Sequence, residues 1–140
     1  MNNKILSVIK YMLSILFIYA GVYKISNVSL FKSQLYQSPL LPDLLIPYIA
    51  IGLPLFEICL GVVLIFAYKL DYIALMISFC LMVFFSLYLI ILFTLYTKPP
   101  CSCGGILSEM SYPVHITFNI IFTLLSLFAL YLYNLSRRQS

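Results

Sequence analysis

The sequence predicts an all-α, polytopic membrane protein: a four-transmembrane-helix bundle with a short interfacial helix in the first outer loop. Hydrophobic residues make up 64% of the 140 residues and charged residues only 9%, with a mean hydropathy of +1.08. Soluble chains are about half apolar and about a quarter charged. The apolar residues form four continuous runs, without the period-two alternation of barrel strands. The expected surroundings are therefore a lipid bilayer, and a net charge of +4 is too small and scattered for nucleic-acid binding.

Each apolar run is long enough to cross a bilayer as a helix, which needs about 20 mostly apolar residues. The predicted spans are residues 5–25, 45–68, 72–96 and 113–134, and we expect residues 1–140 to form one transmembrane domain. The first run also has features of a signal peptide, because Lys4 and Lys10 precede a short apolar stretch. No small-residue cleavage site follows cleanly. We therefore expect a retained helix, with Lys10 snorkelling to the inner surface.

The basic residues predict the orientation of the bundle. With the N-terminus inside, five basic residues lie on the inner face and three on the outer face. The inner residues are Lys4, Lys10, Lys69, Arg137 and Arg138, and the outer residues are Lys24, Lys32 and Lys98. We expect a bacterial inner (cytoplasmic) membrane protein with both termini cytoplasmic. Residues 26–44 and 97–112 then form periplasmic loops, and apolar spacing within residues 29–37 predicts a short helix at the membrane surface.

The second periplasmic loop contains two cysteines, Cys101 and Cys103, followed by Gly104 and Gly105. A disulfide between residues i and i+2 is strained and therefore easily reduced, and the two glycines let another backbone approach closely. This pattern favours a thiol–disulfide exchange pair facing a periplasmic partner. A static loop clip or unreactive thiols would give the same spacing. Cys101, Cys103 and His115 could also bind a soft metal ion, but structural zinc sites use wider spacing and four ligands, so no metal is expected.

His115 and Asn119 lie in the first turns of the fourth predicted helix and share one face. A helix N-terminus disfavours protonated imidazole. A neutral His115 could therefore accept a proton from a loop thiol and increase the fraction of reactive thiolate. The alternative is that both side chains only form hydrogen bonds between helices.

Glu57 lies near the middle of the second predicted span. Burying an ionised carboxylate at that depth of the bilayer costs about 2.5 kcal/mol or more in free energy. It is therefore either protonated or paired, and Lys24 is the basic residue that could reach it from a neighbouring span. Proton handling or quinone headgroup binding would explain Glu57, and so would a protonated carboxyl group that holds two helices in register.

Four small residues within the spans have simpler interpretations. Cys59 and Cys80 are predicted to be buried and to behave as small hydrophobic residues, too deep to reach the loop thiols without a relay. Gly21 and Gly61 are predicted to be positions where helices pack closely.

The order of these motifs resembles the MauE family within the wider DoxX-like four-helix membrane proteins. The motifs are Ala20-Gly21-Val22-Tyr23-Lys24, Phe31, Pro54-x-x-Glu57-x-x-x-Gly61, Cys101-x-Cys103-Gly104-Gly105 and His115-x-x-x-Asn119. The resemblance implies a redox-associated protein that works with a periplasmic thioredoxin-like partner in forming disulfides in a secreted protein, and its DoxX-like side implies quinone. It also implies Cys101 and Cys103 as the redox pair, Glu57 and Lys24 as functional membrane positions, and His115 as a modulator.

Together with this resemblance, the sequence features predict a membrane thiol–disulfide oxidoreductase component that exchanges with a thioredoxin-like or secreted partner and is coupled to quinone. Two other functions fit the same sequence. One is a non-catalytic subunit that binds or positions a secreted or membrane complex. The other is a metal or small-molecule carrier with Glu57 in its path.

Overall fold

A computed structural model describes residues 2–95 and 111–139 of the chain, and this part contains helices and no strands. The elements are α1 (Asn2–Ser26), α2 (Val28–Tyr36), α3 (Ile46–Phe66), the 3₁₀ helix η1 (Tyr68–Leu70), α4 (Asp71–Leu95) and α6 (Tyr112–Gln139). Four of the described helices are long and apolar enough to cross a membrane. The predicted fold class is confirmed, and the chain is a multi-pass membrane protein.

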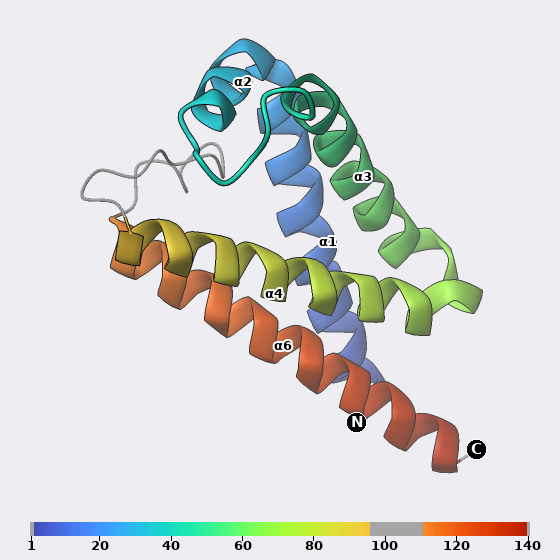
Figure 1. Cartoon of the computed structure of the whole chain (residues 1–140). Coiled ribbons are helices and arrows are strands. Elements are labelled where there is room, and N and C mark those ends of the chain that lie inside the picture. Colours follow the sequence, from blue (N-terminus) through green and yellow to red (C-terminus); the bar gives the residue numbers. More distant parts are fainter. Residues whose placement is uncertain (1, 96–110, 140) are drawn as a thin grey trace.

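The short helix predicted after the first span is also present, as α2. Its residues Phe31 and Leu35 are buried and pack with Ile46 and Ala50 of α3, while Leu30 on the same helix is exposed. Figure 1 shows α2 at the end of α1, beside the start of α3. Its position at the membrane surface stays a prediction.

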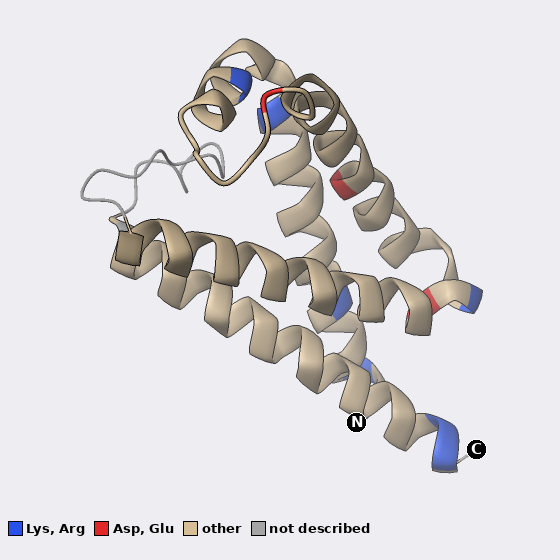
Figure 2. Cartoon of the chain, in the orientation of Figure 1, with Lys and Arg blue, Asp and Glu red and all other residues tan. Residues whose placement is uncertain are grey.

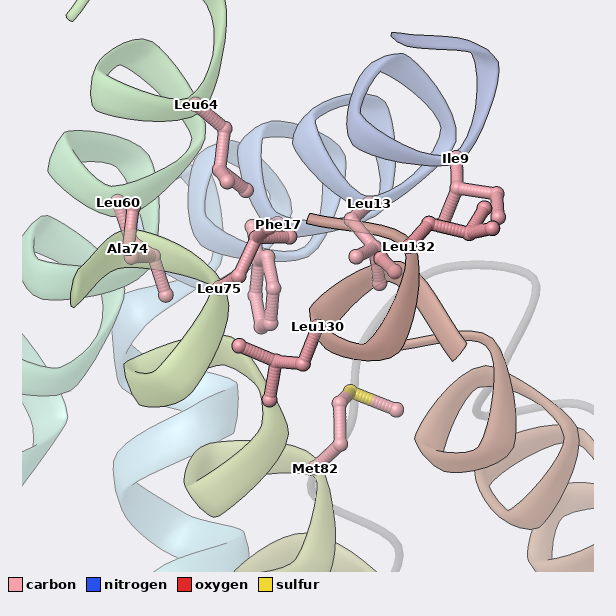
Figure 3. Close-up of a cluster of buried hydrophobic side chains, with 11 residues drawn as sticks. Ile9, Leu13, Phe17, Leu60, Leu64, Ala74, Leu75, Met82, Leu130 and Leu132 are labelled. Atoms are coloured by element: carbon pink, nitrogen blue, oxygen red, sulfur yellow. The ribbon is translucent and has the colours of Figure 1, made fainter. Parts of the chain in front are cut away.

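The long helices pack as two pairs that meet at a shared core. α1 packs along α3, α4 packs along α6, and α1 also contacts α6 (Figure 1). The core between them is apolar, and Figure 3 shows side chains from all four helices converging there. Its residues include Leu13, Phe17, Leu60, Leu64, Leu75, Met82, Leu130 and Leu132.

Two glycines allow α1 and α3 to approach closely, as the sequence predicts. A Cβ atom added at Gly21 would lie 2.7 Å from the carbonyl oxygen of Pro54, and one at Gly61 would lie 2.9 Å from that of Ser14. The Ser14 hydroxyl donates a 2.7 Å hydrogen bond to the carbonyl oxygen of Gly61. Close backbone contact and a small polar residue thus join these helices, as is common in membranes.

We expect Gly21→Ala to destabilise the protein by about 1 to 3 kcal/mol, because the backbone of α3 must shift to admit the methyl group. Gly52→Ala is the matched control on α3, since an added Cβ at Gly52 meets no atom within 4 Å. The control should be neutral or stabilising, because alanine favours helices by about 0.5 to 1 kcal/mol. The free energy of unfolding of both variants is measured in mixed micelles. Equal changes in the two variants would contradict the close-packing role of Gly21.

Lys10 does not snorkel to the inner surface, so this prediction is wrong. Its Nζ lies 2.7 Å from Oδ1 of Asp71 in a buried ion pair, and 5.3 Å from the centre of the Tyr68 ring. The turn between α3 and α4 brings Asp71, the first residue of α4, against α1. A nearby carboxylate gives the ammonium a partner inside the protein. Figure 2 shows how few charged residues the helices carry.

Cys59 and Cys80 are exposed rather than buried, so this prediction is also wrong. Both cysteines lie on helices long enough to span the membrane but face away from the packed core. In a bilayer such positions contact lipid, which suits a small apolar side chain as well as a protein core does.

Candidate functional site

The candidate site is organised around a buried ion pair between α1 and α3. Nζ of Lys24 lies 2.8 Å from Oε1 and 3.0 Å from Oε2 of Glu57. Lys24 is 3% exposed and Glu57 is 1% exposed. The predicted pairing of Glu57 with Lys24 is confirmed. A buried charge that lacks a partner is costly, so each residue makes the position of the other tolerable.

The glycine contact between α1 and α3 explains why the two charges meet. Gly21 contacts the Pro54 carbonyl oxygen. Gly21 also lies beside the backbone nitrogen of Ile58, the residue after Glu57, and Lys24 lies about one turn beyond Gly21 on the same face of α1. The backbones are therefore already close where the ion pair forms.

Aromatic rings from two other helices surround the ammonium group of Lys24. Its Nζ lies 5.0 Å from the ring centre of Phe85 on α4 and 5.6 Å from that of Phe31 on α2. Rings within about 6 Å of a cation attract it, more strongly when the cation is desolvated. The ammonium is thus held by one carboxylate and two rings, which come from three other helices, α3, α2 and α4.

His115 and Asn119 from α6 complete this polar cluster. They are 1% and 5% exposed, and they line a cavity of about 30 Å³ together with Lys24, Glu57 and Phe85. The prediction that they share a face is confirmed. The side-chain nitrogen of Asn119 has no hydrogen-bond partner among residues 2–95 and 111–139. The cavity is large enough for a water molecule to accept that hydrogen bond.

The family model described as methylamine utilisation protein MauE matches residues 2–132. The chain belongs to the MauE family. No curated protein and no solved structure gives a significant match to the chain. The match covers all the site residues predicted from the sequence, whereas the wider DoxX-like relationship stays a prediction. MauE membership implies a membrane role in a redox-related system.

The remaining predicted site residues of this MauE protein lie outside the described part of the chain. These residues are Cys101, Cys103, Gly104 and Gly105. The predicted action of His115 on the loop thiols, and the metal alternative that uses them, therefore stay untested. Among residues 2–95 and 111–139, no group of three potential metal ligands comes together.

Sequence reasoning found the polar members of the MauE site but missed its aromatic member on α4. Lys24, Glu57, His115 and Asn119 are recognisable because each is polar within or beside an apolar run. Phe85 is one of 11 phenylalanines, and nothing in its local sequence separates it from the others. The pair of Lys10 and Asp71 was also missed, although both are charged residues at the edges of predicted spans.

Proposed function

We propose that this MauE-family protein is an inner-membrane thiol–disulfide exchange component. In this proposal Cys101 and Cys103 accept electrons from a periplasmic thioredoxin-like or secreted partner, and a membrane quinone accepts them in turn. The observation that carries the proposal is the buried cluster of Lys24, Glu57, His115 and Asn119, which gathers proton-bearing groups inside an otherwise apolar bundle. Ionisable residues at membrane depth usually mark functional sites.

The proposed exchange is a two-electron reaction. A thiolate of the partner attacks one sulfur of the Cys101–Cys103 disulfide and forms a mixed disulfide. The second thiolate of the partner then attacks this bond, which leaves the partner oxidised and Cys101 and Cys103 as a dithiol. Two electrons and two protons pass from the dithiol to the quinone, forming quinol and restoring the disulfide.

The buried cluster supports the proton side of this reaction. A carboxyl group and an imidazole can each carry a proton, and both line one small cavity with Lys24. The described chain resumes at Ser111, after the loop that contains Cys101 and Cys103, and His115 lies four residues further on. It is thus placed at the end of the bundle to which the loop is attached. Gly104 and Gly105 would let the partner backbone approach the cysteines.

The proposed orientation places the cysteine loop in the periplasm. Lys10 and Lys24 are each neutralised by a buried carboxylate. Leaving these two aside, the inner face has four basic residues and the outer face has two, Lys32 and Lys98. The excess of positive charge at cytoplasmic loops and ends supports cytoplasmic termini.

Trapping a covalent partner tests the proposed function. In the reverse direction of the exchange, the Cys101 thiolate attacks the disulfide of an oxidised partner, and Cys103 then resolves the mixed disulfide. Cys103→Ser removes this resolving thiol, so we expect a partner-linked band on non-reducing gels that disappears on reduction. The lipid-facing cysteines provide the control: Cys59→Ser with Cys80→Ser should give no such band and should keep normal function. A membrane-impermeant thiol reagent should label the reduced loop cysteines in intact cells.

Two results would contradict this proposal. If the combined Cys101→Ser and Cys103→Ser variant supports normal function, the thiol–disulfide exchange function is wrong. The protein is then better explained as a non-catalytic subunit that binds or positions a secreted or membrane complex. If the loop is labelled only after the inner membrane is permeabilised, the proposed orientation is reversed.

A further inference from the structure

A second and larger cavity adjoins the buried ion pair. Its volume is about 420 Å³, and it lies between α1, α2, α3, α4 and the connection from α2 to α3. In the part of the chain that the structure describes, five aliphatic and five aromatic side chains line it, and Lys24 is the one charged residue among them. Cavities of about 300 to 1,000 Å³ with apolar walls and a few polar groups are typical sites for small molecules.

Two of the residues that line this apolar space carry hydrogen-bond donors. The hydroxyl group of Tyr88 is buried and has no partner among residues 2–95 and 111–139. The ammonium of Lys24 has three hydrogens, and its bonds to the carboxylate of Glu57 leave donor capacity for a further acceptor. A ligand with carbonyl oxygens would satisfy both groups, since each of them donates.

The charge of the cavity indicates that its ligand is neutral. Lys24 already has Glu57 as its counter-ion, so an anionic headgroup would bring an unmatched negative charge. Among residues 2–95 and 111–139, no carboxylate lines the cavity, so a cationic group would find no counter-ion there. The aromatic walls of Phe31, Phe84 and Phe85 suit a flat ring, which stacks on or packs edge-to-face against aromatic side chains.

The cavity opens beside exposed side chains of α3 and α4, two of the helices long enough to span a membrane. Tyr48 is 74% exposed and Phe84 is also exposed, whereas Lys24 and Phe31 at the other end are buried. A ligand can therefore place a polar ring at Lys24 and leave a long apolar tail among the lipids.

We infer that this cavity binds the headgroup of a membrane-soluble quinone, with Tyr88 and Lys24 donating hydrogen bonds to its carbonyl oxygens. This inference rests on the proposed function in that the quinone is the electron acceptor proposed above. Lys24 and Phe85 line both cavities. The ring therefore lies against Lys24, which also lines the small cavity with Glu57, His115 and Asn119, close to the groups that can supply the two protons of quinol formation.

Fluorescence quenching tests this inference directly. The chain contains no tryptophan, so Tyr48→Trp creates a single reporter at the opening of the cavity. Tyr131→Trp is the control, because Tyr131 is 61% exposed on α6 and lies outside the cavity lining. With the full chain in detergent, decylubiquinone should quench the first reporter saturably and the second only in proportion to its concentration.

A second variant tests the proposed hydrogen bond. In the Tyr48→Trp background, Tyr88→Phe removes one donor and should raise the Kd for decylubiquinone on the order of tenfold. Tyr72→Phe on the same helix is the matched control and should leave the Kd unchanged, because Tyr72 does not line the cavity.

Three results would overturn the quinone site. They are equal, unsaturable quenching of both reporters, an unchanged Kd in Tyr88→Phe, and displacement of the quinone by phosphatidylglycerol at similar concentration, which would indicate a lipid-chain site. The combined Cys101→Ser and Cys103→Ser variant separates this inference from the proposed function. Saturable quenching in that variant supports the site, even if no mixed disulfide is ever trapped.

Discussion

Glu57→Gln is expected to destabilise the protein by about 3 to 5 kcal/mol and to abolish its redox phenotype. The substitution leaves the ammonium of Lys24 buried beside an amide that cannot neutralise it, and breaking a buried ion pair on one side typically costs this much. The loss of stability is measured by unfolding in mixed micelles. The phenotype is measured as the oxidation state, in cells that carry this variant, of the partner protein that the trapping experiment identifies.

A charge-neutral double variant separates stability from function at this site. Combining Lys24→Met with Glu57→Gln removes both charges, and replacing a buried pair with uncharged groups is often neutral or stabilising. We expect stability near that of the unmodified protein but no redox phenotype, because the ionisable carboxyl group is gone. A fully active double variant would show that the pair only holds α1 and α3 together, and proton handling would be excluded.

Asp71→Asn is expected to lower the free energy of unfolding by about 3 kcal/mol, at the lower end of the range for removing one partner of a buried ion pair. Its partner Lys10 keeps a small exposed fraction and a long side chain, so it can move part of the way toward the membrane surface. The combined Lys10→Met and Asp71→Asn variant should regain most of the stability. Unlike the variant at Lys24 and Glu57, it should keep the redox phenotype, because neither residue lines a cavity of the candidate site.

These two ion pairs differ in their surroundings. Lys10 and Asp71 join α1 to the start of α4 with one aromatic ring nearby. Lys24 and Glu57 instead lie beside a small polar cavity and a large apolar one. Loss of function at both pairs, despite restored stability, would indicate that charge within the bundle matters generally and would weaken the assignment of the site to Lys24 and Glu57.

The sequence by itself determined the membrane class, the four long helices and the short α2. These properties follow from local composition, because about 20 consecutive apolar residues without turn signals have few alternatives to a spanning helix. The sequence also indicated Lys24, Glu57, His115 and Asn119 as candidate site residues. A polar side chain is conspicuous in an apolar run, and its cost inside a bilayer implies a partner.

Only the tertiary structure decided which side chains meet. It paired Lys10 with Asp71, placed Phe85 against Lys24, turned Cys59 and Cys80 outward, and formed the cavity beside Tyr88. The charges of Lys10 and Asp71 are visible in the sequence, but neither their pairing nor the other three features has a local signal, for a physical reason. In a soluble protein the face of a helix toward the core is more apolar than the face toward water, but lipid tails are as apolar as a protein core. Residue type therefore does not distinguish the two faces of a spanning helix, and their assignment depends on packing between segments far apart in the chain.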